Sequence, residues 1–422
     1  MIRFAIMFAL YATLCNGATF YVVNGLDESL GWVNPDSEAF NSQAVTLGSL
    51  ANDVVVTNDR LFVVNSGLGT LQVINRQSLT TVDEIALTGS VNPYSATDLT
   101  NSRVAVTGLL SGTVSIVNVE SGDVDTTFVT GDGPQAILEH GGLIYVLNTG
   151  VVFPVFNPGK LKRYSAESYA LIDSSELGIN PQSMAIIGNE LHVLCTGDYA
   201  NVTGSVQIVN LETMSISQTL ELGGSPGAIA ANGDEVFIAA GGWVDAGYVF
   251  HYNAETRQII NNANNPILCG IGATDILVQP TGDFVVTCFQ DATIEFCTPD
   301  GIDRIVYEMS AGAGALGVWR ETSEAVEMHP ETVQDLCILS AYPNPFNGSV
   351  MLDWNGQLRT PNQIKIFDVL GRNVGELSVS AGVSRVMWTP SATGGLEVAT
   401  GVYFARFADG STSQSVRIVY VK

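Results

Sequence analysis

Residues 61–75 read Leu-Phe-Val-Val-Asn-Ser-Gly-Leu-Gly-Thr-Leu-Gln-Val-Ile-Asn, and this stretch decides the fold of most of the chain. Two short runs of apolar residues flank a tight Gly-containing turn, which is typical of a pair of antiparallel strands. The first of these strands recurs seven times, starting at residues 20, 61, 103, 144, 191, 236 and 284. A repeat of 41 to 48 residues with several strands in each unit predicts an all-β fold, a β-propeller.

The two ends of the repeat are incomplete in complementary ways. The innermost strands of the units are expected to begin near Asn52, Pro93, Pro134, Pro181, Pro226, Ala273 and Ala315. Residues 315–320 have no second strand after them, whereas residues 19–48 supply three strands with no innermost strand before them. If these halves complete one blade, a seven-bladed propeller closes and no sheet edge stays open.

The strand and loop pattern of residues 19–320 resembles the YVTN family of bacterial propellers. The resemblance implies a seven-bladed β-propeller fold. It includes no diagnostic catalytic motif, and therefore it implies no particular activity.

The end of the chain carries three further motifs. They are Tyr-Pro-Asn-Pro-Phe-Asn at 342–347, Ile-Lys-Ile-Phe-Asp-Val-Leu-Gly-Arg at 364–372 and Gly-Val-Tyr-Phe-Ala-Arg at 401–406. Short β-prone runs between turn residues predict strands over 350–354, 363–368, 376–379, 384–388, 401–407 and 415–421. Antiparallel strands at this spacing predict a small Ig-like β-sandwich.

Together these motifs resemble the C-terminal (type A) sorting domain of cargo proteins of the bacterial type IX secretion system. The resemblance covers residues 338–422 and implies that the secretion machinery is a partner. It implies that the protein passes through the periplasm and is then anchored at the outer cell surface or secreted. It also implies that the domain is cleaved off near the preceding linker during export. An ordinary Ig-like module without a sorting role is the alternative. The motif residues are Pro343, Asn344, Pro345, Phe346, Asp368, Gly371, Arg372, Gly401, Tyr403 and Lys422.

The beginning of the chain is consistent with export. Arg3 precedes an apolar run from Phe4 to Leu14, which small residues follow, so residues 1–17 are expected to be a signal peptide. Cys15 raises the alternative of a lipoprotein, but the bulky Leu14 precedes it. The propeller is then expected over 18–320, an acidic linker over 321–337 and the sorting domain over 338–422.

Composition limits the classes of partner. The formal net charge is −25, and a surface this acidic repels phosphate backbones, which argues against nucleic acid. No apolar stretch after the leader approaches the length of a membrane span. Cys195 and Cys288 occupy equivalent positions in two repeats, which favours buried free thiols over a disulfide. No metal site or cofactor is predicted.

Three neighbouring units have long loops between their second and third strands, where the other units have tight turns. These loops lie within residues 148–160, 195–204 and 240–247 and are expected on the face where the innermost strands begin. Binding residues concentrate on long loops of rigid scaffolds, so a glycan or exposed peptide could bind there. The candidate ligand-binding residues are Phe153, Phe156, Tyr199, Trp243, Asp198 and Asp245. The alternative is that these aromatic rings pack beneath their own loops.

Support for catalysis is thin. The histidines His192 and His251 fall within strands and His329 in the linker, so no metal triad is evident. No nucleophile elbow or phosphate-binding Gly loop is present. The sequence thus favours a secreted binding or interaction protein. A lactonase-like or lyase-like propeller enzyme with an extracellular substrate is the alternative, and acidic or His residues at the channel mouth would favour it.

Overall fold

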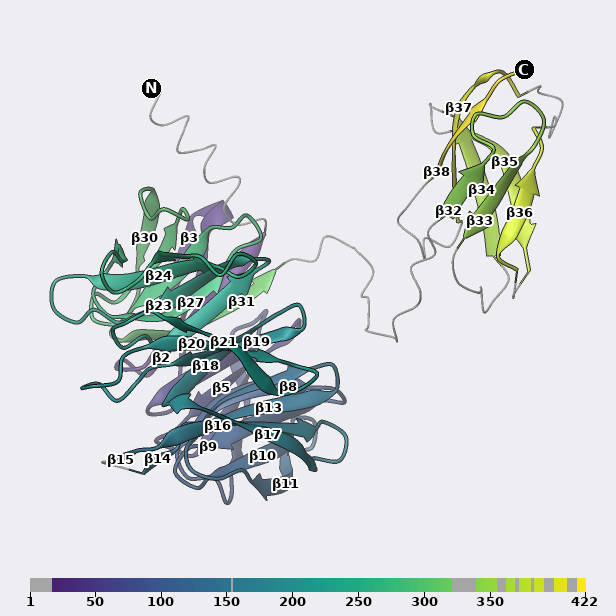
Figure 1. Cartoon of the computed structure of the whole chain (residues 1–422). Helices are drawn as coiled ribbons and strands as arrows, with labels where there is room; N and C mark the ends of the chain where they lie inside the picture. Colours follow the sequence, from purple (N-terminus) through teal and green to yellow (C-terminus); the bar gives the residue numbers. More distant parts are fainter. Residues whose placement is uncertain are drawn as a thin grey trace. The chain divides into compact units, whose positions relative to one another are not determined.

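The computed structural model describes residues 17–152, 155–320, 339–354, 362–368, 372–380, 383–390, 398–407 and 416–422. These residues form two compact units, one within residues 1–322 and one within 323–422 (Figure 1). Residues 1–16 of the expected signal peptide and the whole expected linker lie outside the described residues, as do Phe153 and Gly371. No helix in the described part of the chain is both long and apolar enough to cross a membrane.

Within the described residues, the first unit is built from seven large antiparallel sheets, six of four strands and one of five, and a two-stranded hairpin in one loop. Each large sheet is one blade of the propeller, and its strands run in order from the innermost to the outermost. Blade I is β31 (Ala313–Arg320), β1 (Ala18–Asn24), β2 (Ser29–Asn34) and β3 (Ala39–Thr46), with a 3-10 turn at Pro35–Ser37. Blade II is β4 (Ala51–Val56), β5 (Arg60–Asn65), β6 (Thr70–Asn75) and β7 (Thr80–Ala86). Blade III is β8 (Pro93–Leu99), β9 (Arg103–Gly108), β10 (Thr113–Asn118) and β11 (Asp123–Val129).

The remaining four blades follow in chain order. Blade IV is β12 (Pro134–His140), β13 (Leu143–Asn148), β16 (Pro158–Ser165) and β17 (Leu171–Ile179). Blade V is β18 (Pro181–Ile187), β19 (Glu190–Cys195), β20 (Ser205–Asn210) and β21 (Ser215–Glu221). Blade VI is β22 (Ala228–Asn232), β23 (Glu235–Ala239), β24 (Gly247–Asn253), β25 (Ile259–Asn261) and β26 (Ile267–Cys269). Blade VII is β27 (Ala273–Val278), β28 (Phe284–Cys288), β29 (Thr293–Cys297) and β30 (Arg304–Glu308).

The burial pattern explains why the middle strands have nearly continuous apolar sequences. Both faces of each blade pack on neighbouring blades, so β5 buries every residue from Leu61 to Asn65. The outermost strand β7 lies at the periphery and exposes all its residues except Ile85. Side chains of blade II, such as Val64, share one buried apolar cluster with side chains of blade III, such as Val106. The core therefore lies between the blades, as it does in other propellers.

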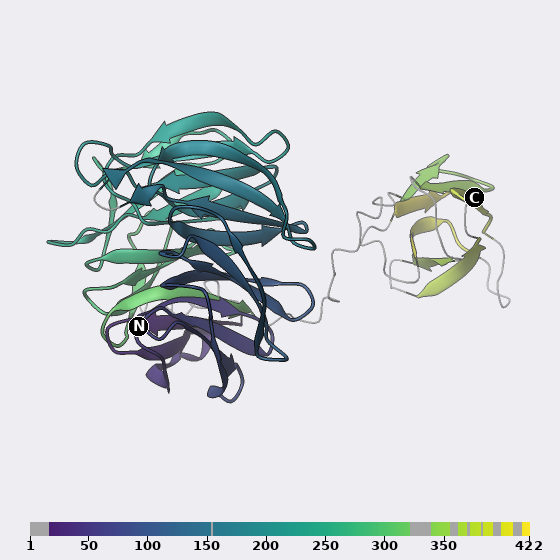
Figure 2. The same cartoon turned by 90° about the horizontal axis from the view of Figure 1, so that it is seen from below.

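The ring closes through the two ends of the repeat, which confirms the predicted shared blade. β1 pairs with β31 along its length, with Phe20 opposite Val318. In Figure 2 the light-green β31 lies beside the purple N-terminal strands. The innermost strands contact one another in the order β31, β4, β8, β12, β18, β22 and β27, and β27 contacts β31 again.

The strand register defines two faces of the ring. In blade V, Pro181 at the start of β18 lies opposite Cys195 at the end of β19, which lies opposite Ser205. The β19–β20 loop thus lies on the face where the innermost strand begins. We call this face the upper face and the opposite one the lower face. In every blade the upper face carries the loop between the second and third strands.

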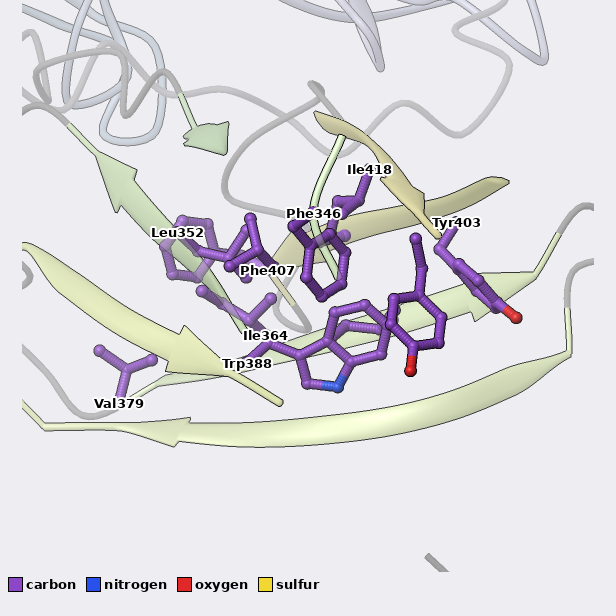
Figure 3. Packing of buried hydrophobic residues seen from close by; sticks show 12 residues of the cluster. Phe346, Leu352, Ile364, Val379, Trp388, Tyr403, Phe407 and Ile418 are labelled. Carbon is purple, nitrogen blue, oxygen red and sulfur yellow. The ribbon is translucent and has the colours of Figure 1, made fainter. Parts of the chain in front are cut away.

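The second unit is a β-sandwich. One sheet consists of β32 (Leu339–Tyr342), β33 (Val350–Trp354) and β36 (Arg385–Trp388), in the order β32-β33-β36. The other consists of β34 (Asn362–Asp368), β35 (Asn373–Val379), β37 (Gly401–Phe407) and β38 (Val416–Tyr420), in the order β35-β34-β37-β38. Figure 3 shows the core, in which Phe346, Trp388 and Tyr403 lie close together among aliphatic side chains.

Candidate functional site

The three long loops lie on the upper face of consecutive blades. They span residues 149–157 in blade IV, 196–204 in blade V and 240–246 in blade VI. Their blades are neighbours because the innermost strands β12, β18 and β22 contact one another in that order. We call these the rim loops.

The first two rim loops meet through a pair of aromatic rings. The short hairpin of β14 (Val151–Val152) and β15 (Val155–Phe156) carries Phe156. Its ring meets the ring of Tyr199 edge to face, with 5.9 Å between the centroids. Tyr199 is 59% exposed, and its hydroxyl accepts a hydrogen bond of 3.1 Å from Nε2 of Gln182 on the innermost strand β18. Tyr199 therefore connects the rim to the centre of the face.

Trp243 extends from the third rim loop toward blade VII. Its side chain is 56% exposed, and its ring lies edge to face against Phe289, with 6.2 Å between the centroids. Gly272 makes room for the indole, because a Cβ atom there would lie 2.7 Å from Cζ3 of Trp243. The ring thus lies between Gly241 of its own loop and the next blade, and more than half of its surface is exposed.

The two rim carboxylates differ in role. Oδ1 of Asp198 accepts hydrogen bonds of 2.7 to 2.9 Å from the backbone N–H groups of Ala200, Asn201 and Val202. These donors, that of Val202 first, hold the pKa of Asp198 below its ordinary value. Asp198 therefore shapes its own loop. Asp245 is exposed, and no side-chain partner for it occurs among the residues that the structure describes.

A second polar group occupies the innermost strands, and the sequence analysis missed it. Asp53 on β4 accepts hydrogen bonds from Oγ of Ser95 at 2.8 Å and from the backbone N–H of Ala96 at 2.9 Å, both on β8. Asp275 on β27 accepts one of 2.8 Å from the backbone N–H of Leu316 on β31. Each carboxylate thus joins its blade to the innermost strand of the next blade. Alignment of the innermost strands would have revealed an Asp at the same position twice.

Burial changes the acidity of this inner group. It raises the pKa of Asp53, and it raises that of Asp275 to about 6, with a further contribution from the charge of Asp53. Burial and then the nearby Asp53 also raise the pKa of Tyr94, whose hydroxyl interacts with Gln135 of blade IV.

His192 has a structural role in the propeller. His192 is fully buried, and its Nδ1 lies 2.5 Å from the hydroxyl oxygen of Tyr252, on which the imidazole stacks. Burial, followed by the charge of Arg257, lowers the pKa of His192 to about 4, so this ring is neutral at physiological pH. In the described ranges no three His, Cys, Asp or Glu side chains are placed to hold a metal ion.

Cysteines within the described residues are buried free thiols. They are Cys195, Cys269, Cys288 and Cys297. This agrees with the prediction from the repeat-equivalent positions of Cys195 and Cys288.

The motif residues of the sandwich clamp its last strand. Asn344 accepts a hydrogen bond of 2.8 Å from the backbone N–H of Val419 and donates one of 2.6 Å to the carbonyl of Arg417. The buried Phe346 exchanges backbone hydrogen bonds with Val419 and Val421. Pro343 and Pro345 on either side of Asn344 are exposed.

The other two motifs also stabilise the sandwich. Asp368 and Arg372 close a turn through an ion pair of 2.7 Å. Tyr403, in the strand that begins at Gly401, is buried and donates a hydrogen bond of 2.6 Å to the carbonyl of Ala399. The exposed Lys422 donates its backbone N–H to Oγ1 of Thr400 at 3.0 Å.

Comparison with known proteins identifies the second unit. Residues 340–422 match the family described as the secretion system C-terminal sorting domain. No curated protein matches the chain. The chain therefore carries the sorting domain of type IX export, which engages the secretion machinery and directs the protein to secretion or to attachment at the outer surface.

Solved structures resemble the first unit in fold. A putative 6-phosphogluconolactonase from Bacteroides fragilis has a TM-score of 0.58 at 11% identity, over 72% of this chain and 98% of that one. A functionally unknown protein from Desulfotomaculum acetoxidans has a TM-score of 0.55 at 16% identity, over 72% and 99%. Hydrazine synthase of Kuenenia stuttgartiensis has a TM-score of 0.52 at 12% identity, over 69% and 92%. Identities this low establish the propeller fold alone.

Proposed function

Because residues 340–422 form a sorting domain that marks the chain for export, we propose that the propeller is a binding module that acts outside the cell. In this proposal residues 18–320 are the cargo, residues 321–337 link them to the sorting domain, and the ligand is an extracellular glycan or protein. The rim loops of blades IV, V and VI hold this ligand. Propellers commonly present binding residues on such loops, since the scaffold beneath them is rigid.

One observation supports this site above others. Tyr199 and Trp243 expose more than half of their surface although they stand on loops of adjacent blades. Aromatic side chains this exposed lose burial energy unless a partner covers them, and Tyr and Trp are the residues most enriched among binding anchors. The edge contacts with Phe156 and Phe289 fix both rings in place, so little conformational entropy is lost on binding.

A glycan and peptide array probed with the full chain tests the proposal. For the ligand found, we expect Tyr199→Ala and Trp243→Ala to weaken binding by about 1–3 kcal/mol each, if both rings are anchors. Ile302→Ala on the lower face is the control, because Ile302 is exposed and lies away from the rim loops. If both aromatic variants stay folded and bind as well as the wild type, the site is wrong.

An enzyme of lactonase-like or lyase-like type is the second candidate, and the inner carboxylates favour it. A carboxyl with a pKa of about 6, as at Asp275, has the acidity of a general acid or base. Asp53 and Asp275 accept hydrogen bonds from backbone N–H groups of adjacent blades, and these bonds support a structural role instead. Screening the chain against lactones and uronic-acid polymers, beside Asp53→Asn and Asp275→Asn, separates the two roles. Turnover that these variants abolish without unfolding would establish the enzyme.

A further inference from the structure

The exposed apolar side chains of the propeller are distributed unevenly between its two faces. Among the described residues, the loops of the lower face expose one large apolar side chain, Ile302. Upper-face loops expose many, and these occur in blades I to VI and not on the rim loops alone. They are Leu26, Leu50, Leu68, Val91, Leu110, Val152, Val155, Tyr199, Val202, Trp243 and Val244. Exposed apolar surface gathered on one face marks an interaction site.

Charge is distributed unevenly as well. The upper-face loops contain no Lys, Arg or His among the described residues, whereas lower-face loops contain Arg76 and Arg257. Every charged residue of the upper-face loops is acidic. These residues are Asp27, Glu28, Asp132, Asp198, Asp245 and Asp291.

Three of these carboxylates are available to a partner. Asp27, Asp198 and Asp291 accept hydrogen bonds from the protein itself, for example Asp291 from the backbone N–H of Ile271 at 2.7 Å. Glu28, Asp132 and Asp245 are exposed, and within the described ranges no hydrogen bond or ion pair engages their side chains. They belong to the loops of blade I, of the connection from blade III to blade IV, and of blade VI.

We propose that the upper face as a whole docks a cationic, apolar segment of another polypeptide. This inference rests on the proposed binding function and names the class of its ligand. Sugar rings stack on aromatic side chains, but blades I to III present Leu and Val, which match apolar side chains of a polypeptide. Lys or Arg side chains of the partner would lie against Glu28, Asp132 and Asp245, since opposite charges at an interface fix specificity and speed association.

Three labelled peptides of equal length serve as probes of the full chain by fluorescence anisotropy. One alternates Lys with Leu and Trp, the second replaces Lys with Glu, and the third replaces Leu and Trp with Ser. We expect the first to bind at least about tenfold more tightly than either of the others, because both its charge and its apolar groups are complementary to the face. Its affinity should fall as salt is raised, since exposed ion pairs are screened.

Variants then locate the binding surface. Leu68 and Leu110 lie outside the rim loops. The variants Leu68→Ser and Leu110→Ser should each lower the affinity for the Lys-Leu-Trp peptide about fivefold. The triple variant Glu28→Gln, Asp132→Asn, Asp245→Asn should weaken it about tenfold and flatten the salt dependence. The triple variant Glu167→Gln, Glu212→Gln, Glu255→Gln, at exposed positions on lower-face loops, is the matched charge control and should leave the affinity unchanged.

The outcomes separate this inference from the proposed function. Binding of a glycan that depends on Trp243, with no binding of the Lys-Leu-Trp peptide, would leave the proposed function standing and overturn the inference. Peptide binding that ignores Leu68, Leu110 and the three carboxylates would also overturn it. If no probe on the array and no peptide binds, both ideas fail.

Discussion

Asp275 introduces a charge where the ring of blades closes. It accepts hydrogen bonds of 2.8 Å from its neighbour Ile276 on β27 and from Leu316 on β31 of blade I. Burial opposes the ionised form, and this effect exceeds the stabilisation from the two backbone N–H donors, so the pKa rises. The contact of Asp275 with β31 therefore stabilises the closed ring of blades less when the carboxyl is charged.

The stability of the propeller should therefore depend on this group in a defined range of pH. The pKa of Asp275 is about 6 when folded and 3.8 ordinarily, so its stabilisation is complete below about pH 4 and is lost as pH rises through 6. We expect the free energy of unfolding of Asp275→Asn, relative to that of the wild type, to increase when the pH is raised from 4.5 to 7.5. The increase should be on the order of 1–3 kcal/mol. Urea unfolding at both pH values measures the gain, with the exposed Asp245→Asn as control. If the variant and the wild type differ in unfolding free energy by the same amount at both pH values, burial does not raise the pKa of Asp275.

Buried thiols give a second prediction at this scale. Burial raises the pKa of Cys195 to about 12, so the reactive thiolate is scarce at neutral pH. In a Cys337→Ser variant without the leader, we expect Ellman's reagent to detect almost no thiol until denaturant is added. Denaturant should then reveal Cys195, Cys269, Cys288 and Cys297 together. Fast labelling of the folded protein would show that these thiols are accessible.

At the scale of loops and strands, Gly272 determines where the third rim loop can rest. Its φ of +83° disfavours other residues, and a Cβ atom there would collide with the Trp243 ring. We expect Gly272→Ala to destabilise the protein by about 1–3 kcal/mol and to shift Trp fluorescence, because the indole must move. In the double variant with Trp243→Ala, part of this loss should be recovered, since the collision with the ring is removed. Purely additive losses would show that the ring and Gly272 are not coupled.

Closure by pairing of β1 with β31 gives a prediction at the element scale. Deletion of residues 18–46 removes β1, β2 and β3 and leaves the edge of β31 unpaired. We expect the melting temperature to fall by more than about 10 °C, or the protein to aggregate, because an open edge and the flanks of two blades become exposed. The control is a chain that keeps these strands and lacks residues 338–422. Equal melting of the deletion and this control would refute the shared blade.

Sequence predicted the elements better than it predicted the site. The repeat of the apolar runs predicted the seven blades and the closure of the ring, because the middle strands, such as β5, are buried on both faces. It missed β32, a four-residue strand that runs into the Tyr-Pro motif, and it placed the start of β22 near Pro226 instead of at Ala228. Loop length identified the rim loops correctly. The turn around Asp198 depends on backbone donors that no residue pattern specifies. The inner carboxylates were missed although Asp53 and Asp275 occupy the same position in two innermost strands.

At the scale of the whole molecule, the signal for delivery resides in the sandwich. Its motif residues stabilise the sandwich itself, as Asn344 and Phe346 show by bonding to its last strand. The ring of the propeller closes through β1 and β31, which both belong to the first unit. Each unit can therefore be removed to test its role alone.

Deletion of residues 338–422 should abolish delivery and preserve the propeller. In a host with the type IX system we expect the truncated chain to remain in the periplasm, folded, because the sorting domain that engages the machinery is gone. Fractionation and immunoblotting measure its location. Its melting temperature should stay within a few degrees of that of the full chain, about the change expected for a ΔΔG below 1 kcal/mol. Surface delivery of the truncated chain would show that another segment carries the sorting signal.

The double variant Asn344→Ala with Phe346→Ala should remain in the periplasm too, since it removes the side chains of Asn344 and Phe346 that hold β38 in the sandwich.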